Sequence, residues 1–425
     1  MKRIPETTST YTDNLLIQSL SSTPDPNEVL GRLTYLPPVP RDVSKLPKHE
    51  RLHHLMQVRD LHIPSAIECQ LVQSIDLMIK QGYSYRDPRQ AMTWTAISGE
   101  ATAAGIRLPK SLSAAVEGLS GVGKTEACLR SLHALGPQVV AHESFPKLVG
   151  RHVQVVWLSV EVPPSGRASD LARSLMHAWH NATGGSRFDA VLSKDRIDGM
   201  KALDEWRQVA TSHFLGILHL DEIQNLFKIR SLKERKNRTE SRLELSIVED
   251  QVLRWFLNLT NTGQIPVIVS GTPDGIGALT KRLSTAQRIN TAGYHRFDRF
   301  TDPTEGSFRN IFLPVLGRYQ YVETPLRVDD ALAKLIIDLT AGIPRIIIAL
   351  WIGAHRVAFE RRDDDLRHAD FTTAASTWLA PLQHAVKAIR EGNAVAMSRY
   401  EDLTQADTNF WRSFWQQSTN ASSTS

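Results

Sequence analysis

GLSGVGKT, residues 118–125, is the stretch of this sequence that decides the fold. It satisfies the pattern G-x-x-x-x-G-K-[ST], and it lies between a short apolar run, SAAVE, and the start of a helical pattern, TEACLRSL. A strand, a glycine-rich turn and a helix in this order form a phosphate-binding loop, because the backbone N–H groups of the turn surround an anion. The sequence therefore predicts a P-loop nucleotide-binding domain.

Each position of this loop has an expected role in binding ATP and Mg²⁺. Gly118, Gly121 and Gly123 allow the backbone to turn tightly around phosphate. Lys124 neutralises the β- and γ-phosphates, and the Thr125 hydroxyl is a ligand for Mg²⁺. The other loop positions expected to contact ATP are Ser120, Val122 and Glu126. The alternative is a chance glycine-rich turn, which the flanking strand and helix disfavour.

The sequence around the loop has the alternation of an α/β domain. Residues 112–320 alternate short β-rich runs with longer helical stretches, which predicts a parallel sheet with helices on both faces. The strand candidates are residues 112–117, 153–160, 214–220 and 265–270. The last three are almost wholly apolar, as strands covered on both faces should be.

An acidic pair follows the third strand candidate. Asp221 and Glu222 come directly after the apolar run FLGILHL, at the edge where open α/β sheets present ligand groups. We expect Asp221 to hold Mg²⁺ and Glu222 to orient the attacking water, so that ATP is hydrolysed and not only bound. The alternative for Glu222 is a solvated residue at a helix start, where acidic residues are common.

Three further positions are expected to act on the nucleotide. Thr272 ends the strand candidate IPVIVSG and would lie beside the γ-phosphate, although a G-T-P-D turn is also common after strands. Arg345 heads an apolar helix in TAGIPRIIIALW, where it would reach the nucleotide from a lid domain, or be an exposed helix-start arginine. Arg299 or Arg296 is the candidate for an arginine that acts on a neighbouring subunit, and the spacing does not choose between them.

The regions that flank the α/β core divide the chain into four parts. Seven prolines within residues 1–48 predict an extended arm with little packing, and residues 50–82 have a helical spacing that Pro64 interrupts. We expect an N-terminal arm and helical module over 1–90, which docks a partner, and the nucleotide-binding domain over 91–320. A helical lid over 321–397 and a C-terminal tail with an aromatic segment over 398–425 complete the division.

Composition limits the class of protein. Cys69 and Cys128 have no ligand-like neighbours, so neither a disulfide framework nor a zinc site is predicted. No run of about 18 apolar residues occurs, and the N-terminus lacks the apolar region of a signal peptide, so we expect a soluble, cytoplasmic protein without a membrane partner. A net charge of +5 permits a polyanionic partner without identifying one.

The set GLSGVGKT, HLDEIQNL, VIVSGTPD and TAGIPRIIIAL, in this order, resembles the TnsC/TniB family of AAA+ ATPase regulators of bacterial DNA transposition. YTDNLLIQSL and IKQGYSYRDP also look like the upstream part of the longer TnsC-type members. The resemblance implies an AAA+ P-loop domain, a small helical lid and a helical N-terminal extension. It also implies a homo-oligomer, a ring or filament on double-stranded DNA, that connects a TniQ-type target selector with the transposase.

That resemblance assigns roles to residues of this chain. Lys124 and Thr125 match the Walker A pair, and Asp221 and Glu222 match the Walker B pair. Thr272 matches the first sensor, and Arg345 matches the second. The family pattern does not place the arginine that acts in trans.

Two surface features are candidates for partner contacts. The stretch KIRSLKERKNRTESR, residues 228–242, has seven Lys or Arg against two acids, and such a cluster predicts contact with DNA phosphates or simply a solvated helix face. The DNA contacts are assigned to Lys228, Arg230, Lys233, Arg235 and Lys236. Near the C-terminus an aromatic ridge is expected to serve core packing, or alternatively to bind transposase; it comprises Phe410, Trp411, Phe414 and Trp415.

Two other classes of ATPase share the nucleotide core. A signalling or defence ATPase of the STAND kind would assemble on sensing a ligand, and appended repeat sensors would indicate it; no repeat is visible in the sequence. A replication-initiator ATPase would carry a winged-helix region beyond the lid, and the C-terminal sequence does not have that pattern.

Overall fold

The computed structural model describes residues 11, 14–99, 105, 109–229, 245–247, 250–261, 264–280 and 287–392. By their internal contacts these residues form two compact units. Unit 1 comprises residues 1–33, 64–118 and 124–296, and unit 2 comprises residues 34–63, 119–123 and 297–425. The four-part division expected from the sequence stays a prediction.

Unit 1 is built on a five-stranded sheet with the strand order β4-β5-β8-β1-β9. The strands are β1 (Ser113–Gly118), β4 (Trp157–Glu161), β5 (Ile217–Asp221), β8 (Val267–Gly271) and β9 (Gly293–Phe297). The pairs β4–β5, β5–β8 and β1–β8 are parallel, and Glu161 lies opposite Asp221 in the register. Parallel pairing brings the C-terminal ends of these four strands to one edge of the sheet, where the site residues lie.

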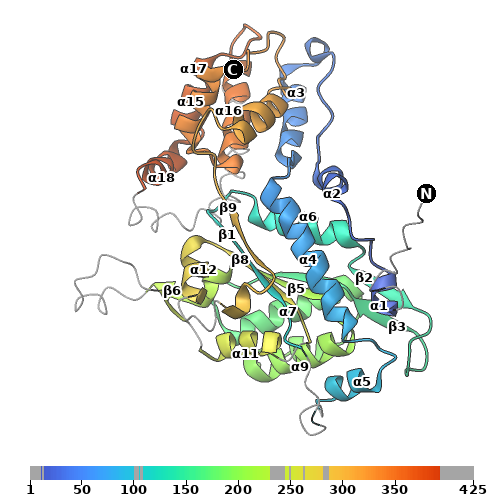
Figure 1. The fold of residues 1–425 in the computed structure, drawn as a ribbon. Helices are drawn as coiled ribbons and strands as arrows, with labels where there is room; N and C mark the ends of the chain where they lie inside the picture. Colours follow the sequence, from blue (N-terminus) through green and yellow to red (C-terminus); the bar gives the residue numbers. More distant parts are fainter. Residues whose placement is uncertain are drawn as a thin grey trace, which may run out of the picture. The chain divides into compact units, whose positions relative to one another are not determined.

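Helices cover both faces of this sheet (Figure 1). Helices α4 (Ala66–Ser84) and α6 (Lys124–Leu135) pack together on one face. Helices α7 (Ala168–Thr183), α9 (Gly199–Ser212) and α11 (Asp250–Asn261) lie on the other. Their apolar sides form one core with the strands, and that core includes the fully buried Trp206. The predicted α/β fold of the AAA+ P-loop type is confirmed.

The remaining elements of unit 1 are short. They are α1 (Leu15–Gln18), α2 (Pro26–Leu33), α5 (Ala91–Ile97), β2 (Val139–His142), β3 (His152–Val155), α8 (Asp189–Leu192), η3 (Ile223–Leu226), β6 (Phe227–Ile229), β7 (Leu245–Ile247) and α12 (Pro273–Thr280). Strands β2 and β3 form one antiparallel hairpin, and β6 and β7 form another.

Unit 2 is mostly helical. Its elements are η1 (Val43–Lys45), α3 (Lys48–Leu55), η2 (Met56–Asp60), η4 (Ser307–Phe312), α14 (Leu313–Leu316), α15 (Asp330–Thr340), α16 (Pro344–Phe359), α17 (His368–Ser376) and α18 (Ala380–Arg390). Helix α16 forms the centre of a separate apolar core, which also takes in Leu55, Val58 and Leu61 of the N-terminal segment. The segment 34–63 is therefore part of the same folded unit as the C-terminal helices.

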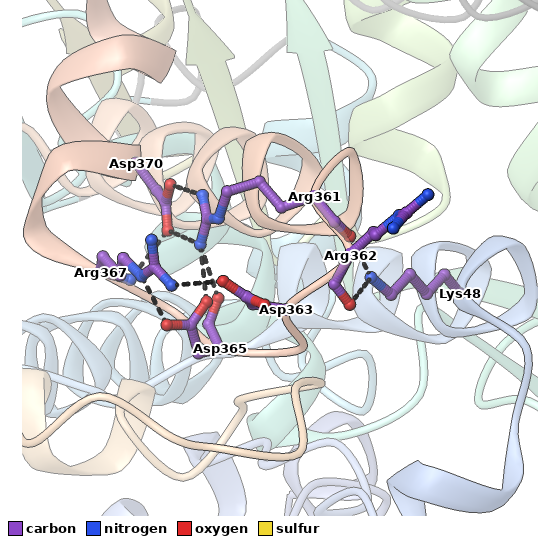
Figure 2. A network of polar contacts seen from close by, with 7 residues as sticks. All are labelled: Lys48, Arg361, Arg362, Asp363, Asp365, Arg367 and Asp370. Atoms are coloured by element: carbon purple, nitrogen blue, oxygen red, sulfur yellow. Dashed lines mark hydrogen bonds and ion pairs between the residues drawn. The ribbon is translucent and has the colours of Figure 1, made fainter.

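Ion pairs fasten that N-terminal segment to the turn between α16 and α17. Arg51 of α3 makes a buried ion pair with Asp364, with 2.5 Å between Nη1 and Oδ2, and both side chains are almost inaccessible. The Lys48 ammonium donates to the backbone carbonyl of Arg361 (Figure 2). The Arg361 guanidinium in turn pairs with Asp370 and Asp365.

More exposed charges continue this network. Arg367 pairs with Asp363 and Asp365 within the same turn (Figure 2). Its side chain is about half exposed, so solvent screens these pairs more than it screens the pair between Arg51 and Asp364.

The structure differs from the expectation for the N-terminal arm. Residues 26–33 form helix α2 even though Pro26 and other prolines suggested an extended chain. Proline is tolerated at the first helical position, because its missing N–H would have no intrahelical partner there. The Asp25 carboxylate accepts hydrogen bonds from the N–H groups of Asn27 and Glu28, and Leu33 is buried. The arm is therefore packed over this stretch.

The other regular elements agree better with the sequence. All four predicted strands are present, and the run predicted as a single strand over 153–160 divides into β3 and β4. The predicted break at Pro64 separates η2 from α4. Among the described residues, no single helix has the length and apolar composition to cross a membrane. Helices α15 and α16 reach that length and composition only when they are taken as a pair, and the chain bends by 113° between them.

Several predicted contact residues lie outside the described residues. They are Arg230, Lys233, Arg235 and Lys236 of the basic stretch and Phe410, Trp411, Phe414 and Trp415 of the aromatic ridge. Of the basic stretch, the backbone of Lys228 lies in β6. The predictions for DNA and transposase contacts at these positions stay predictions.

Candidate nucleotide site

The phosphate loop has the backbone that an anion-binding turn requires. Strand β1 ends at Gly118 and helix α6 begins at Lys124. Gly121 and Gly123 have φ angles of 85° and 102°, which only glycine adopts without strain. A Cβ atom at Gly123 would meet nothing within 4 Å, so the turn leaves open space there. The residues present therefore fit a bound phosphate group.

Thr125 and Asp221 meet at the head of this helix. The Thr125 hydroxyl donates a hydrogen bond of 2.6 Å to Oδ2 of Asp221, although the two residues lie 96 positions apart in the sequence. A hydroxyl and a carboxylate beside a phosphate loop form an oxygen donor set of the kind that Mg²⁺ takes together with phosphate and water. The side chains that the sequence assigned to Mg²⁺ are thus brought together.

Asp221 is held as a carboxylate. Its other oxygen, Oδ1, accepts hydrogen bonds from the Ser270 hydroxyl and from the backbone N–H of Glu222. Burial alone would raise the pKa of Asp221, but the His219 ring and these donors together keep that pKa below its ordinary value. The group is therefore ionised and ready to bind a cation.

The surroundings of Glu222 shift its pKa in the opposite direction to that of Asp221. Two effects raise the pKa of Glu222 above its ordinary value: burial, which is the larger, and the negative charge of Asp221. Its backbone is left-handed, with φ 54° and ψ 44°, a conformation that is rare for residues other than glycine and that concentrates at functional sites. A carboxylate with a raised pKa is a better proton acceptor, which suits the role of a general base.

Gln224 connects the acidic pair with the end of β8. Its amide N–H group donates to Oε2 of Glu222, and its carbonyl oxygen accepts a 3.1 Å hydrogen bond from the backbone N–H of Thr272. Thr272 is buried, and its hydroxyl accepts a long hydrogen bond of 3.4 Å from the backbone N–H of Gly275. The sequence analysis did not single out Gln224, although the motif DEIQN contains it.

A row of three polar side chains, one half-buried and two fully buried, leads to Asp221. His219 is fully buried in β5 between Ser159 of β4 and Ser270 of β8. Nδ1 of His219 lies 2.8 Å from the Ser159 hydroxyl, and Nε2 lies 2.7 Å from the Ser270 hydroxyl. Burial lowers the pKa of His219, and the charge of Asp221 acts in the opposite direction. The sequence signal for this row of polar side chains was a histidine within an otherwise apolar strand.

Two other titratable groups lie beside this site. Glu161 lies opposite Asp221 in the sheet, and burial together with the charge of Asp221 raises the pKa of Glu161. Burial, followed by the charges of Asp221 and Glu68, raises the pKa of the Cys128 thiol well above its ordinary value. Cys128 therefore stays a neutral thiol.

The other predicted loop contacts have mixed surroundings. Val122 is buried, and Ser120 is half-buried. Glu126 is exposed and pairs with Arg130 of its own helix at 2.6 Å. Lys124 is only 5% exposed, so most of its side chain is shielded from solvent.

The three predicted arginines have different surroundings. Within unit 2, the backbone N–H of Arg345 donates to the carbonyl of Gly121 over 3.2 Å, and the Arg345 side chain is exposed. The Arg299 guanidinium donates to the carbonyl of Ala341 at 2.8 Å, and it lines a pocket of about 250 Å³ together with Lys334. Arg296 is an exposed residue of β9 in unit 1. The choice between Arg296 and Arg299 stays open.

Comparison with known proteins agrees with the nucleotide fold. Residues 110–279 match the family model of the AAA domain, a segment that includes the phosphate loop, the acidic pair and Thr272. These residues form an AAA domain. No curated protein matches the chain.

Among the solved structures that this chain resembles, two illustrate the level of similarity. The Aeropyrum pernix Orc1 protein in complex with DNA is 17% identical, with a TM-score of 0.41, over 70% of this chain and 66% of that one, just under two thirds of its length. The Walker-type ATPase of Pyrococcus abyssi is 12% identical, with a TM-score of 0.38, over 76% of this chain and 78% of that one. Neither similarity is high enough to carry an inference about activity or partners.

Proposed function

We propose that this chain binds Mg²⁺·ATP at residues 118–125 and hydrolyses it. The observation that carries the proposal is the 2.6 Å contact between the Thr125 hydroxyl and the Asp221 carboxylate at the start of helix α6, which follows the phosphate loop in the sequence. This contact supports the proposal because a Mg²⁺ ion bound to the phosphates of a nucleotide takes oxygen ligands of this kind.

The residues of the site divide the work of hydrolysis. Lys124 and the loop N–H groups neutralise the phosphates, and Thr125 and Asp221 would hold Mg²⁺. The ion would stabilise the charge that develops on the transferring phosphoryl group. Glu222 accepts the proton of the attacking water, and the Gln224 amide holds the Glu222 carboxylate in place.

An ATP titration of the Lys124→Ala variant tests this assignment. The variant loses the positive charge of the loop, so we expect no detectable ATP binding at nucleotide concentrations that saturate the wild-type protein. Lys201→Ala, an exposed substitution on α9, is the control and should bind ATP normally. Unchanged affinity in Lys124→Ala would remove the site from residues 118–125.

We further propose that the chain is a transposition regulator of the TnsC/TniB type. In this proposal the ATP-bound protein assembles as a ring or filament on double-stranded DNA and links a TniQ-type selector with the transposase, and hydrolysis drives disassembly. Its support is the ordered set GLSGVGKT, HLDEIQNL, VIVSGTPD and TAGIPRIIIAL together with the basic stretch 228–242.

Electron microscopy with short duplex DNA and a non-hydrolysable ATP analogue tests the assembly. We expect rings or filaments only when both ligands are present. Assembly without DNA would favour a ligand-sensing switch of the STAND kind. Binding of duplex DNA as single particles, without repeated subunits, would favour a replication-initiator type of ATPase.

A salt titration tests the DNA contacts. Replacing Lys228, Arg230 and Lys233 by Gln should reduce the slope of log affinity against log salt by about 0.9 for each lost phosphate contact, equally for unrelated sequences. The control replaces three exposed lysines elsewhere, Lys194, Lys201 and Lys387, by Gln, which makes the same change of charge. Equal slopes for the two triple variants would show that residues 228–233 make no DNA contact.

A further inference from the structure

The polar row that leads to Asp221 crosses three neighbouring strands. Ser159, His219 and Ser270 belong to β4, β5 and β8, and they form an unbroken series of hydrogen bonds that ends on Oδ1 of Asp221. His219 and Ser270 are both 0% exposed. Polar groups are rarely placed in a core unless their hydrogen bonds are satisfied, and here each bond leads toward the same carboxylate.

The direction of these hydrogen bonds follows from the last one. A carboxylate only accepts, so the single hydrogen of the Ser270 hydroxyl is donated to Asp221. Ser270 must then accept from His219, which requires a hydrogen on Nε2. In the tautomer whose only ring hydrogen is on Nε2, Nδ1 accepts from the Ser159 hydroxyl, 2.8 Å away.

We propose that Ser159, His219 and Ser270 form a one-way hydrogen-bond relay that positions the Asp221 carboxylate for Mg²⁺, with Ser270 and His219 as the positioning residues. The relay fixes Oδ1, and Oδ2 is thereby directed toward Thr125. This inference rests on the proposed ATP site and adds residues to it that have no contact with the nucleotide. Outer partners of this kind commonly change metal affinity by about 10- to 100-fold when they are removed.

The relay predicts a graded series of variants. Ser270→Ala removes the bond to Asp221 and should weaken Mg²⁺ binding in the ATP complex by about 10-fold or more. His219→Leu leaves the Ser270 hydroxyl free to rotate, so its effect should be smaller. His219→Gln keeps an N–H donor at a similar position and should restore most of the affinity. Ser159→Ala, three bonds away, should have the smallest effect.

Ser113 supplies a matched control. It lies on β1 of the same sheet, it is 1% exposed, and its hydroxyl has no hydrogen-bond partner within the described chain. Ser113→Ala therefore makes the same chemical change at a similar depth without touching the relay. It should leave Mg²⁺ affinity unchanged.

The experiment measures the binding of Mn²⁺, as a spectroscopic substitute for Mg²⁺, by electron paramagnetic resonance at saturating ATP. ATP binding without metal, measured in EDTA, reports on the phosphate loop and should be the same in all variants. Equal Mn²⁺ affinity in wild type, Ser270→Ala and His219→Leu, with ATP still bound, would overturn the relay and leave the proposed function standing. Absence of ATP binding by the wild type would instead overturn the proposed function, and the relay's role with it.

A second measurement needs no nucleotide. ¹⁵N spectroscopy of the imidazole nitrogens distinguishes the two tautomers of His219, and the His219→Gln spectrum assigns the signal. We expect the hydrogen on Nε2. A hydrogen on Nδ1 would reverse the series of bonds and contradict the proposal, even if some variants failed to fold.

Discussion

Two groups of polar side chains, one in each unit, are arranged differently. In unit 1 a series of hydrogen bonds runs from Ser159 through His219 and Ser270 to the single carboxylate of Asp221, although the same unit also contains a buried charge pair, Lys80 and Asp76. In unit 2 whole charges face each other, as in the buried pair of Arg51 and Asp364. The series ends at an edge of the sheet where a ligand would bind, whereas the charge pair joins segments that are far apart in sequence. We therefore expect substitutions in the series to affect ligand binding and substitutions in the charge pair of unit 2 to affect stability.

The largest expected effect concerns Glu222 in unit 1. Glu222→Gln keeps the shape of the side chain and removes the proton acceptor, so ATP should bind while steady-state turnover falls by about 10²- to 10⁴-fold. Phosphate release is the measurement, and Glu143→Gln, an exposed substitution in the loop between β2 and β3, is the control. Turnover at the wild-type rate would exclude Glu222 as the base.

A second variant breaks the charge pair of unit 2. Arg51→Met leaves the buried Asp364 carboxylate without its cation, which should lower the free energy of unfolding by about 3–5 kcal/mol. Hydrogen exchange of the α3 amides should accelerate in parallel. The exposed Arg41→Met, in the same segment, should change neither quantity. If Arg51→Met were as stable as wild type, the pair would not be what holds residues 34–63 in unit 2.

The third prediction concerns the acid sensitivity that the buried His355 gives to unit 2. His355 is fully buried in α16, and burial lowers its pKa to about 4. The unfolded chain takes up this proton near pH 6.5, but the folded chain does so only near pH 4, so stability is present above pH 6.5 and is lost as the pH falls toward 4. The loss is about 3 kcal/mol for that shift.

Calorimetry between pH 7 and pH 4 measures this loss. His355→Leu should reduce the acid sensitivity of unit 2, whereas the exposed His177→Leu in unit 1 should not. Equal acid sensitivity in wild type and His355→Leu would show that the ring is protonated as easily in the folded chain as in the unfolded one.

The smallest effect is expected where the charges are exposed. Arg367 pairs with Asp363 and Asp365, but its side chain is about half exposed and solvent screens both pairs. Arg367→Gln should therefore leave the melting temperature of unit 2 unchanged within error. A loss as large as that of Arg51→Met would show that the network in Figure 2 acts as one cooperative unit.

The sequence predicted the parts of unit 1 that depend on local pattern. The apolar runs predicted strands β1, β5 and β8, and the glycines of the loop predicted the phosphate turn. Strand β9, GYHRF, carries His295, Arg296 and exposed residues, so it lacks the apolar character that identified the others. Strand β2, VVAH, is apolar but only four residues long. Helix α2 was missed because proline was counted against it without regard to its position at the first turn.

The site was predicted only in part for a related reason. Lys124 and Asp221 belong to motifs that can be read within a few residues. The contacts of His219, by contrast, join residues 60 and 51 positions away, and they depend on which strands are neighbours in the sheet. The sequence of a single strand does not reveal which strands are its neighbours in the sheet. Gln224 likewise gains its role only once the ends of β5 and β8 lie side by side.

The membership of residues 34–63 in unit 2 has a consequence for synthesis on the ribosome. Their apolar side chains, such as Leu55 and Val58, emerge early, yet the helices that cover them begin only after residue 297. At about 5–20 residues per second the intervening chain takes roughly 10–50 s to translate. The nascent protein therefore carries this apolar segment without the helices that cover it in the folded unit for that time. It also means that no single cut in the gene separates the two units.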